Sequence, residues 1–190
     1  MSTLVGLDLT GRRVVVVGAG AVGTRRARRL IEDGARVVLV DPSPSDDARR
    51  MASHGDVEVV ERGVAASDVD GAWLVVTATA DPALNAEVAQ WCLEGRTWCV
   101  NASDGRGGTA RVAASSTHGD LTVGVVSVGD PDPRRVSTVH DALARWTQQG
   151  LWPRINEALR TKTRLMLKKT TCPAPLSSTA KVSKAGSFRL

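Results

Sequence analysis

Four consecutive valines, Val14–Val17, lead directly into the sequence Gly18-Ala19-Gly20-Ala21-Val22-Gly23. The β-branched run predicts a buried strand, and the residues after Gly23 continue as a helix. The glycines follow the order G-x-G-x-x-G. In this order the first glycine permits a tight turn, the second lets a pyrophosphate approach the backbone, and the third lets the helix pack against the strand. The N-terminus of that helix then presents unpaired N–H groups to the phosphates.

The residues around this motif are those of a dinucleotide-binding unit. A second apolar run, Arg36–Val40, follows Gly34 and ends at Asp41. Asp41 stands about twenty residues past the first glycine, where such units place the carboxylate that binds the ribose hydroxyls. An acid there repels a 2′-phosphate and so favours NAD over NADP. The alternative is a loop or helix-capping aspartate in an α/β protein that binds no nucleotide. The expected cofactor contacts are Gly18, Gly20, Ala21, Val22, Gly23 and Asp41.

Strands and helices alternate from residue 13 to residue 101. Further strands are expected over 57–61, 73–78 and 97–101, with helices over 46–53 and 82–94. Asp81-Pro82 predicts a helix start, and Gly95 predicts its end. Such alternation gives right-handed crossovers and a parallel sheet. The predicted fold class is therefore α/β, a Rossmann-type parallel sheet followed by a small C-terminal α/β region.

The pattern changes after Asn101. A polar, glycine-rich stretch leads to a possible strand at Arg111–Ala114, and a second strand is expected over 121–127. Helices are expected over 133–146 and 153–168. We expect residues 1–108 to form the NAD-binding domain, 109–168 a dimerisation and substrate region, and 169–190 a basic irregular tail.

Composition excludes several classes of protein. Only 3% of residues are aromatic, which argues against stacking on single-stranded nucleic acid. No apolar run approaches membrane-spanning length, so no membrane partner and a cytoplasmic location are expected. Residues 161–190 hold seven of the 25 basic residues and no acid, so the net charge of +5 belongs to the tail. Three cysteines, Cys92, Cys99 and Cys172, lack metal-ligand spacing, so reduced thiols and no metal site are expected.

Four segments resemble a known family. They are the opening Leu7–Arg13, the pair Arg25-Arg26, the segment Ala78–Asn85 and the run Asn101-Ala102-Ser103-Asp104. Over roughly residues 4–146 the chain resembles the precorrin-2 dehydrogenases, including the N-terminal module of siroheme synthases. It departs from their pattern at Gly105, where the family has a second acid, in residues 111–115, and in the turn at 127–133.

The resemblance implies oxidation of precorrin-2 to sirohydrochlorin, with a hydride passing to NAD⁺. Bifunctional members of the family also insert Fe²⁺. It further implies that Thr79, Asp81 and Asn85 lie beside the nicotinamide end of the cofactor, and that Asn101 also binds the cofactor. Asp104 stands where the family keeps its catalytic aspartate, just beyond the fifth strand, and is the candidate general base. The alternative for Asp104 is an Asx-turn before Gly105.

Precorrin-2 carries many carboxylates, so its site needs cations. Arg106, Arg111 and Arg134, with Arg135 beside it, lie in segments expected to border the site, and arginine suits carboxylates. The alternative for each is a solvated surface arginine. His118 and His140 are weaker candidate bases, expected in a turn and a helix.

The family also dimerises through its C-terminal half, which implies a homodimer here. Leu143, Trp146, Leu151 and Trp152 are the apolar residues expected to bury at that interface.

Two other functions stay open at this point. A non-catalytic NAD-sensing module would explain the glycines and Asp41 equally well, but not the segments around Thr79 and Asp104. A diverged relative that oxidises another substrate would explain the departures at Gly105 and in the 127–133 turn.

Overall fold

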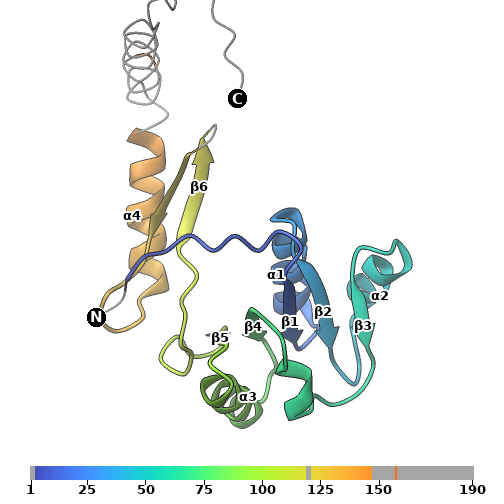
Figure 1. Cartoon of the computed structure of the whole chain (residues 1–190). Helices are drawn as coiled ribbons and strands as arrows, with labels where there is room; N and C mark the ends of the chain where they lie inside the picture. The colour runs from blue at the N-terminus through green and yellow to red at the C-terminus, as the bar shows by residue number, and fades with distance from the viewer. Residues whose placement is uncertain (1–2, 119–120, 147–156, 158–190) are drawn as a thin grey trace, which may run out of the picture. The chain divides into compact units, whose positions relative to one another are not determined.

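The computed structural model describes residues 3–118, 121–146 and 157 (Figure 1). The chain divides into two compact units, Met1–Ala142 and Leu143–Leu190, and nearly all described residues belong to the first. Leu151, Trp152, the helix expected over 153–168, the tail and Cys172 lie outside the described residues. The domain limits expected at 108 and 168 stay predictions.

A five-stranded parallel sheet forms the centre of the first unit, with strand order β3-β2-β1-β4-β5. Its strands are β1 (Arg13–Val17), β2 (Arg36–Val40), β3 (Glu58–Val60), β4 (Leu74–Thr77) and β5 (Trp98–Asn101). The chain proceeds outward from β1 to β3 and then returns to the other side of β1 at β4. The strand order therefore reverses between β1 and β4, and ligands of open parallel sheets bind at the carboxyl ends of the strands at such a point.

Helices cover both faces of the sheet. The helices are α1 (Ala21–Glu32), α2 (Asp46–Ser53) and α3 (Pro82–Glu94), with a 3₁₀ turn, η1 (Ala66–Val69), before β4. Alternate valines of β1 divide between two apolar clusters. Val14 and Val16 pack with residues of α1 and α2, whereas Val15 and Val17 pack with residues of α3. The unbroken valine run thus reflects burial on both faces.

The helix limits follow the capping residues expected from the sequence. The Asp81 carboxylate accepts hydrogen bonds from the N–H groups of Ala83 and Leu84, and Pro82 occupies the first turn of α3. Ser45 caps α2 by accepting from the Ala48 N–H. Each cap satisfies N–H groups that the helix itself leaves unpaired.

A different substructure follows the sheet. Strands β6 (Ala114–His118) and β7 (Leu121–Val125) pair antiparallel, and helix α4 (Pro133–Trp146) comes next. None of the described residues in these three elements is fully buried. A two-stranded hairpin without a covered apolar face is only marginally stable in water.

The strand expected at Arg111–Ala114 was placed too early, because β6 begins only at Ala114. The Arg111 side chain donates hydrogen bonds to the carbonyl oxygens of Gly105, Ser127 and Gly129, which hold its segment as a loop. The strand itself, Ala114-Ser-Ser-Thr-His118, is too polar to be recognised from its sequence.

No helix in the described part of the chain is both long enough and apolar enough to span a membrane.

Asp68 joins β3 to η1 through a two-pronged ion pair. Its two carboxylate oxygens each accept a 2.7 Å hydrogen bond from the Arg62 guanidinium, and one also accepts from the Ala65 N–H. The hydrogen bonds from Arg62 hold the pKa of Asp68 below its ordinary value of 3.8. A carboxylate with a lowered folded-state pKa stabilises the fold above its unfolded-state pKa, and loses that contribution as the pH falls below it.

We therefore expect Asp68→Asn to lower the urea midpoint at neutral pH, and the difference from the unmodified chain to shrink below about pH 4. Urea denaturation at several pH values measures both effects. Asp56→Asn, at an exposed aspartate, is the control. A difference that is the same at every pH would contradict the role given to the ion pair.

Candidate functional site

In the glycine loop between β1 and α1, two glycines lie so close to neighbouring backbone atoms that neither position has room for a side chain. Gly18 has φ of 96°, and a Cβ there would lie 2.7 Å from the Ala78 carbonyl carbon. A Cβ on Gly23 would lie 1.8 Å from the Gly18 carbonyl oxygen. Both positions therefore require glycine for packing, as expected for the first and third glycines of the motif.

Gly20 differs from the other two because it faces open space. It is the N-cap residue of α1 without a side-chain cap, and a Cβ there would meet no protein atom within 4 Å. Ala21 and Val22 follow it, exposed, in the first helical turn. The structure thus leaves room at the positive end of the helix, where a pyrophosphate fits against backbone N–H groups.

Asp41 braces the glycine loop from the carboxyl end of β2. Its Oδ2 accepts a 2.6 Å hydrogen bond from the Ala19 N–H, and its Oδ1 accepts a 2.7 Å bond from the Ser43 N–H. An ionised carboxylate has about four acceptor positions, so two remain for ribose hydroxyls. The side chain is partly exposed, which fits that role. The bonds within the loop also match the loop-aspartate alternative, and ribose binding stays a prediction.

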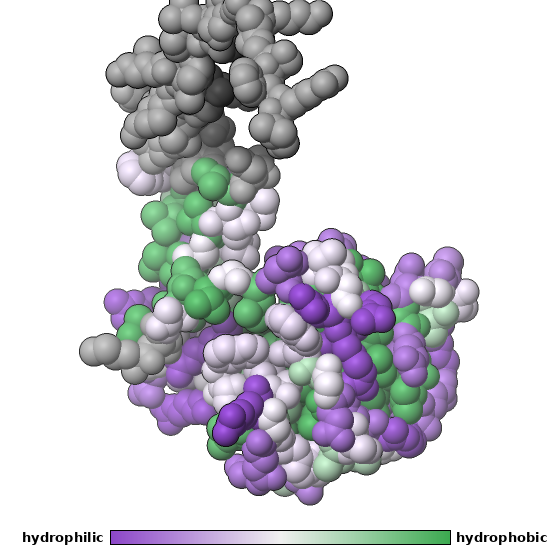
Figure 2. Space-filling model, in the orientation of Figure 1, coloured by the Kyte–Doolittle hydropathy of each residue, from purple (hydrophilic) through white to green (hydrophobic). Residues whose placement is uncertain are grey.

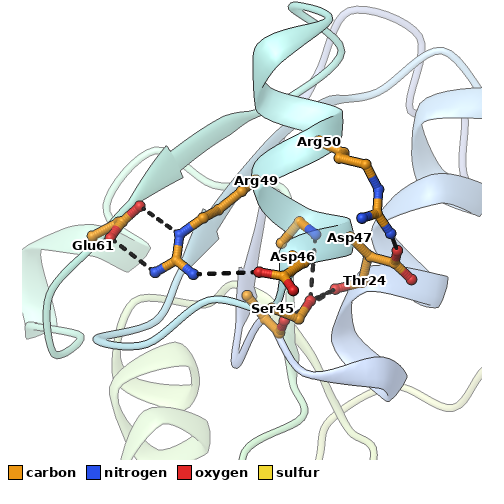
Figure 3. A network of polar contacts seen from close by, with 9 residues as sticks. Thr24, Ser45, Asp46, Asp47, Arg49, Arg50 and Glu61 are labelled. Atoms are coloured by element: carbon orange, nitrogen blue, oxygen red, sulfur yellow. Dashed lines mark hydrogen bonds and ion pairs between the residues drawn. The ribbon is translucent and has the colours of Figure 1, made fainter.

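A second polar contact joins the glycine loop to α2. The Thr24 hydroxyl donates to the Ala19 carbonyl oxygen and lies 3.2 Å from the Ser45 hydroxyl, and the Ser45 N–H also donates to Ala19. Figure 3 shows Thr24 and Ser45 pointing toward each other from the two helices. The loop is thereby held from two sides.

The expected nicotinamide end of the site is organised by a buried asparagine. Asn85 is fully buried in α3. Its Oδ1 accepts from both the N–H and the hydroxyl of Thr79, and its Nδ2 donates to the Thr79 carbonyl and to the Ser103 hydroxyl. The Asp81 carboxylate is used in capping α3. Of the residues expected here, Thr79 and Asn85 bind each other directly, whereas Asp81 shapes the loop.

Asn101 holds the loop that follows β5, as Asn85 holds the loop around Thr79. Its side-chain oxygen accepts hydrogen bonds from the N–H and hydroxyl of Ser103 and from the N–H of Asp104. The Asp104 carboxylate is exposed and accepts a 2.9 Å hydrogen bond from the Arg106 N–H. That bond is the expected Asx-turn, and it orients the carboxylate without burying it.

Ser103 is the residue that sequence reasoning missed. Its hydroxyl accepts from Asn85 and donates to Asn101, so it joins α3 to the loop after β5. The sequence carried no signal for it, because the two asparagines that bind it are sixteen residues apart, one in α3 and the other at the end of β5.

The arginines expected to bind substrate lie in different settings. Arg111 uses its guanidinium on three backbone carbonyl groups, as described above. Arg106 forms an exposed 3.0 Å ion pair with Asp130, and Arg134 is exposed in the first turn of α4. Arg111 thus has a structural task, and substrate binding by all three stays a prediction.

The remaining candidates are two histidines and two cysteines, and the buried Nε2 of His140 has no hydrogen-bond partner among the described residues. His118 lies 3.2 Å from the Ser116 hydroxyl, and His140 lies beside Asp141. Cys92 and Cys99 are buried free thiols, as expected, and their mutual contact together with burial raises the pKa of Cys92. The described residues contain no group of three or more His, Cys, Asp or Glu side chains placed to hold a metal ion.

Comparison with known proteins agrees with this geometry. A family model described as "Putative NAD(P)-binding" matches residues 5–114, more than half of the chain. The chain belongs to this NAD(P)-binding family. The matched residues contain the whole glycine loop, Asp41 and the polar network around Asn85 and Asn101.

Individual relatives carry more specific names. The chain is 43% identical to a siroheme synthase of Pseudomonas entomophila (strain L48) over 81 residues, which span 43% of this chain and 18% of that protein. It is 32% identical to a precorrin-2 dehydrogenase of Priestia megaterium over 124 residues, 65% of this chain and 60% of that protein. The solved structure of the precorrin-2 dehydrogenase SirC is similar, with a TM-score of 0.65 and 26% identity over 76% of this chain and 70% of that one. The chain thus matches less than a fifth of the siroheme synthase.

The contrast between Gly20 and Gly23 gives a test of the glycine loop. Gly20→Val places its side chain in open space at the helix N-terminus, so it should cost at most about 1 kcal/mol of stability as an N-cap change and abolish NAD⁺ binding. Gly23→Ala drives a Cβ into the Gly18 carbonyl and should destabilise the fold by more than about 3 kcal/mol. Thermal unfolding and calorimetric titration with NAD⁺ measure the two effects. A folded Gly20→Val variant with normal NAD⁺ affinity would show that the pyrophosphate binds elsewhere.

Proposed function

We propose that this chain oxidises precorrin-2 to sirohydrochlorin with NAD⁺ as the acceptor. The observation that carries the proposal is the likeness to precorrin-2 dehydrogenases in both sequence and structure. The family model ends at Ala114, whereas the likeness to SirC covers 76% of the chain. The resemblance therefore includes residues outside the general NAD(P)-binding module.

The proposed reaction removes two electrons and two hydrogens from the macrocycle. A C–H bond of the substrate breaks with its electron pair, and a proton leaves from a second position. Bound NAD⁺ supplies the hydride acceptor and leaves as NADH. The protein has to position the substrate and NAD⁺ for hydride transfer, and it has to accept the proton.

The residues described above divide these tasks. The N–H groups at the start of α1 bind the pyrophosphate, and Asp41 binds the ribose and favours NAD⁺ over NADP⁺. Asn85 and Asn101 fix the loops after β4 and β5 through Thr79 and Ser103. Asp104, oriented by the Arg106 N–H, accepts the proton. The exposed guanidinium groups of Arg106 and Arg134 bind substrate carboxylates.

We also infer that the protein is a homodimer that pairs through β6, β7 and α4. These elements bury no residue completely, and they expose Leu121, Val139 and Trp146, each at least 40% exposed. Figure 2 shows hydrophobic side chains gathered on the surface of this region. An apolar surface of this kind on a marginal hairpin favours cover by a second copy of the chain.

Asp104→Asn tests the proposed chemistry. The asparagine oxygen can still accept from the Arg106 N–H, so the loop is preserved while the basicity is lost. Turnover of precorrin-2 should fall by about 10²–10⁴-fold with NAD⁺ affinity unchanged. Single-turnover absorbance measurements at saturating substrate give the rate, and calorimetry gives the affinity.

Three other outcomes point elsewhere. An unchanged single-turnover rate would remove Asp104 from the mechanism. A loss confined to NAD⁺ affinity would give it a role in the cofactor loop. NAD⁺ binding by the unmodified chain without any precorrin-2 turnover would favour a sensing module or a relative with another substrate.

The dimer is tested by light scattering at micromolar concentration. The unmodified chain should have twice the monomer mass, and Val139→Glu should shift it toward monomer by burying a charge at the interface. Ser137→Glu, at an exposed residue about 200° around α4 from Val139, places the same charge on the opposite side of the helix and is the matched control. A monomeric unmodified chain would contradict the inference.

A further inference from the structure

Arg49 is held by two carboxylates beside the ribose end of the candidate site. Its Nε and Nη2 donate to the two oxygens of Glu61, both at 3.3 Å, and its Nη1 lies 3.9 Å from Asp46. Figure 3 shows the Arg49 side chain extending from α2 between these two acids. The guanidinium therefore presents its forked edge to Glu61.

This ion pair lies at the same sheet edge as Asp41. Glu61 directly follows β3, and the carbonyl oxygen of its neighbour Val60 accepts a 3.1 Å hydrogen bond from the Asp41 N–H. Asp41 and Glu61 thus leave adjacent strands, whose spacing is about 4.8 Å. Helix α2, which carries Arg49, is capped by Ser45, whose N–H donates to the Ala19 carbonyl oxygen in the glycine loop.

A 2′-phosphate at this edge needs a cation. Arginine binds phosphate with the forked edge of its guanidinium, which is the edge that Glu61 occupies on Arg49. Arg62, which follows Glu61, is likewise bound through two hydrogen bonds by Asp68. Arg49 and Arg62, which flank Glu61 in space and in sequence respectively, are both paired with carboxylates.

We propose that Glu61 is a second determinant of cofactor choice, because it keeps Arg49 from binding the 2′-phosphate of NADP⁺. Asp41 repels that phosphate directly, whereas Glu61 neutralises the one arginine of α2 whose fork faces this sheet edge. The proposal rests on the dinucleotide site and the NAD⁺ preference proposed above, and it does not depend on precorrin-2 being the substrate.

Glu61 can be replaced without a large effect on folding. The Arg49 and Glu61 side chains are 47% and 51% exposed, and exposed ion pairs contribute little to stability. A change in dinucleotide affinity in a Glu61 variant therefore reports on binding.

The test is calorimetric titration of the full chain with NAD⁺ and with NADP⁺. Glu61→Gln should raise the affinity for NADP⁺ by about three- to tenfold, the scale of one charge-assisted contact at an exposed site. Its affinity for NAD⁺ should stay within about twofold. No gain for NADP⁺, or an equal gain for both dinucleotides, would overturn the proposal.

Two further variants separate release of Arg49 from a general loss of negative charge. Glu61→Gln combined with Arg49→Gln should lose the NADP⁺ gain, and a gain that persists would overturn the proposal. Asp47→Asn removes an acid that pairs with Arg50 on the same helix and is the matched control. An NADP⁺ gain in Asp47→Asn as large as in Glu61→Gln would likewise overturn it.

The unmodified chain separates this proposal from the one before it. If it binds NAD⁺ but Glu61→Gln gains nothing for NADP⁺, only the role of Glu61 is wrong. If it binds neither dinucleotide, both proposals fail. If it binds both but does not oxidise precorrin-2, the role of Glu61 is still decided by the variants.

Discussion

The contact between Gly18 and Gly23 is the constraint on which the rest of the site depends. Because neither residue has a Cβ, the first turn of α1 lies directly against the carbonyl of Gly18, and Gly18 in turn lies against the backbone after β4. This close approach places the N-terminus of α1 at the carboxyl end of β1, where the strand order reverses. It also fixes the distance between the phosphate loop and the loop of Thr79, the two parts that have to bind one extended cofactor.

Two buried side-chain amides extend this fixed arrangement to the loop that follows β5. Asn85 and Asn101 are polar side chains in an otherwise apolar core, and burying them is favourable only because their hydrogen bonds are made. Their partners are loop groups of Thr79, Ser103 and Asp104, so these hydrogen bonds fix the loops that follow β4 and β5. The backbone N–H of the exposed Asp104 is held by Asn101, which is almost fully buried.

The charged groups around the expected ribose end differ from these buried amides, because Arg49 and Glu61 form an exposed ion pair that contributes little to stability. On the proposals above, Glu61 acts on the ligand only through Arg49, so replacing it should change selectivity more than folding, whereas Asp41 also accepts two hydrogen bonds that hold the glycine loop. Stability then comes mainly from the buried valines and amides, and the proposed second determinant of cofactor choice lies in an exposed ion pair.

The sequence by itself determined the sheet, its helices and the glycine loop. The valine runs, the glycine spacing, the Ser45 and Asp81 caps and Gly95 act over a few residues, and each was found where local chemistry puts it. Asp41 was found because its distance from Gly18 along the chain is set by one helix and one strand. Strand β6 was misplaced, because its polar residues carry no local signal and its start is set by Arg111 bonding to distant carbonyls. Only the tertiary structure joined Asn85 to Ser103 and Arg49 to Glu61, since these pairs meet across separate elements and no local pattern in the sequence records which side chains will face each other.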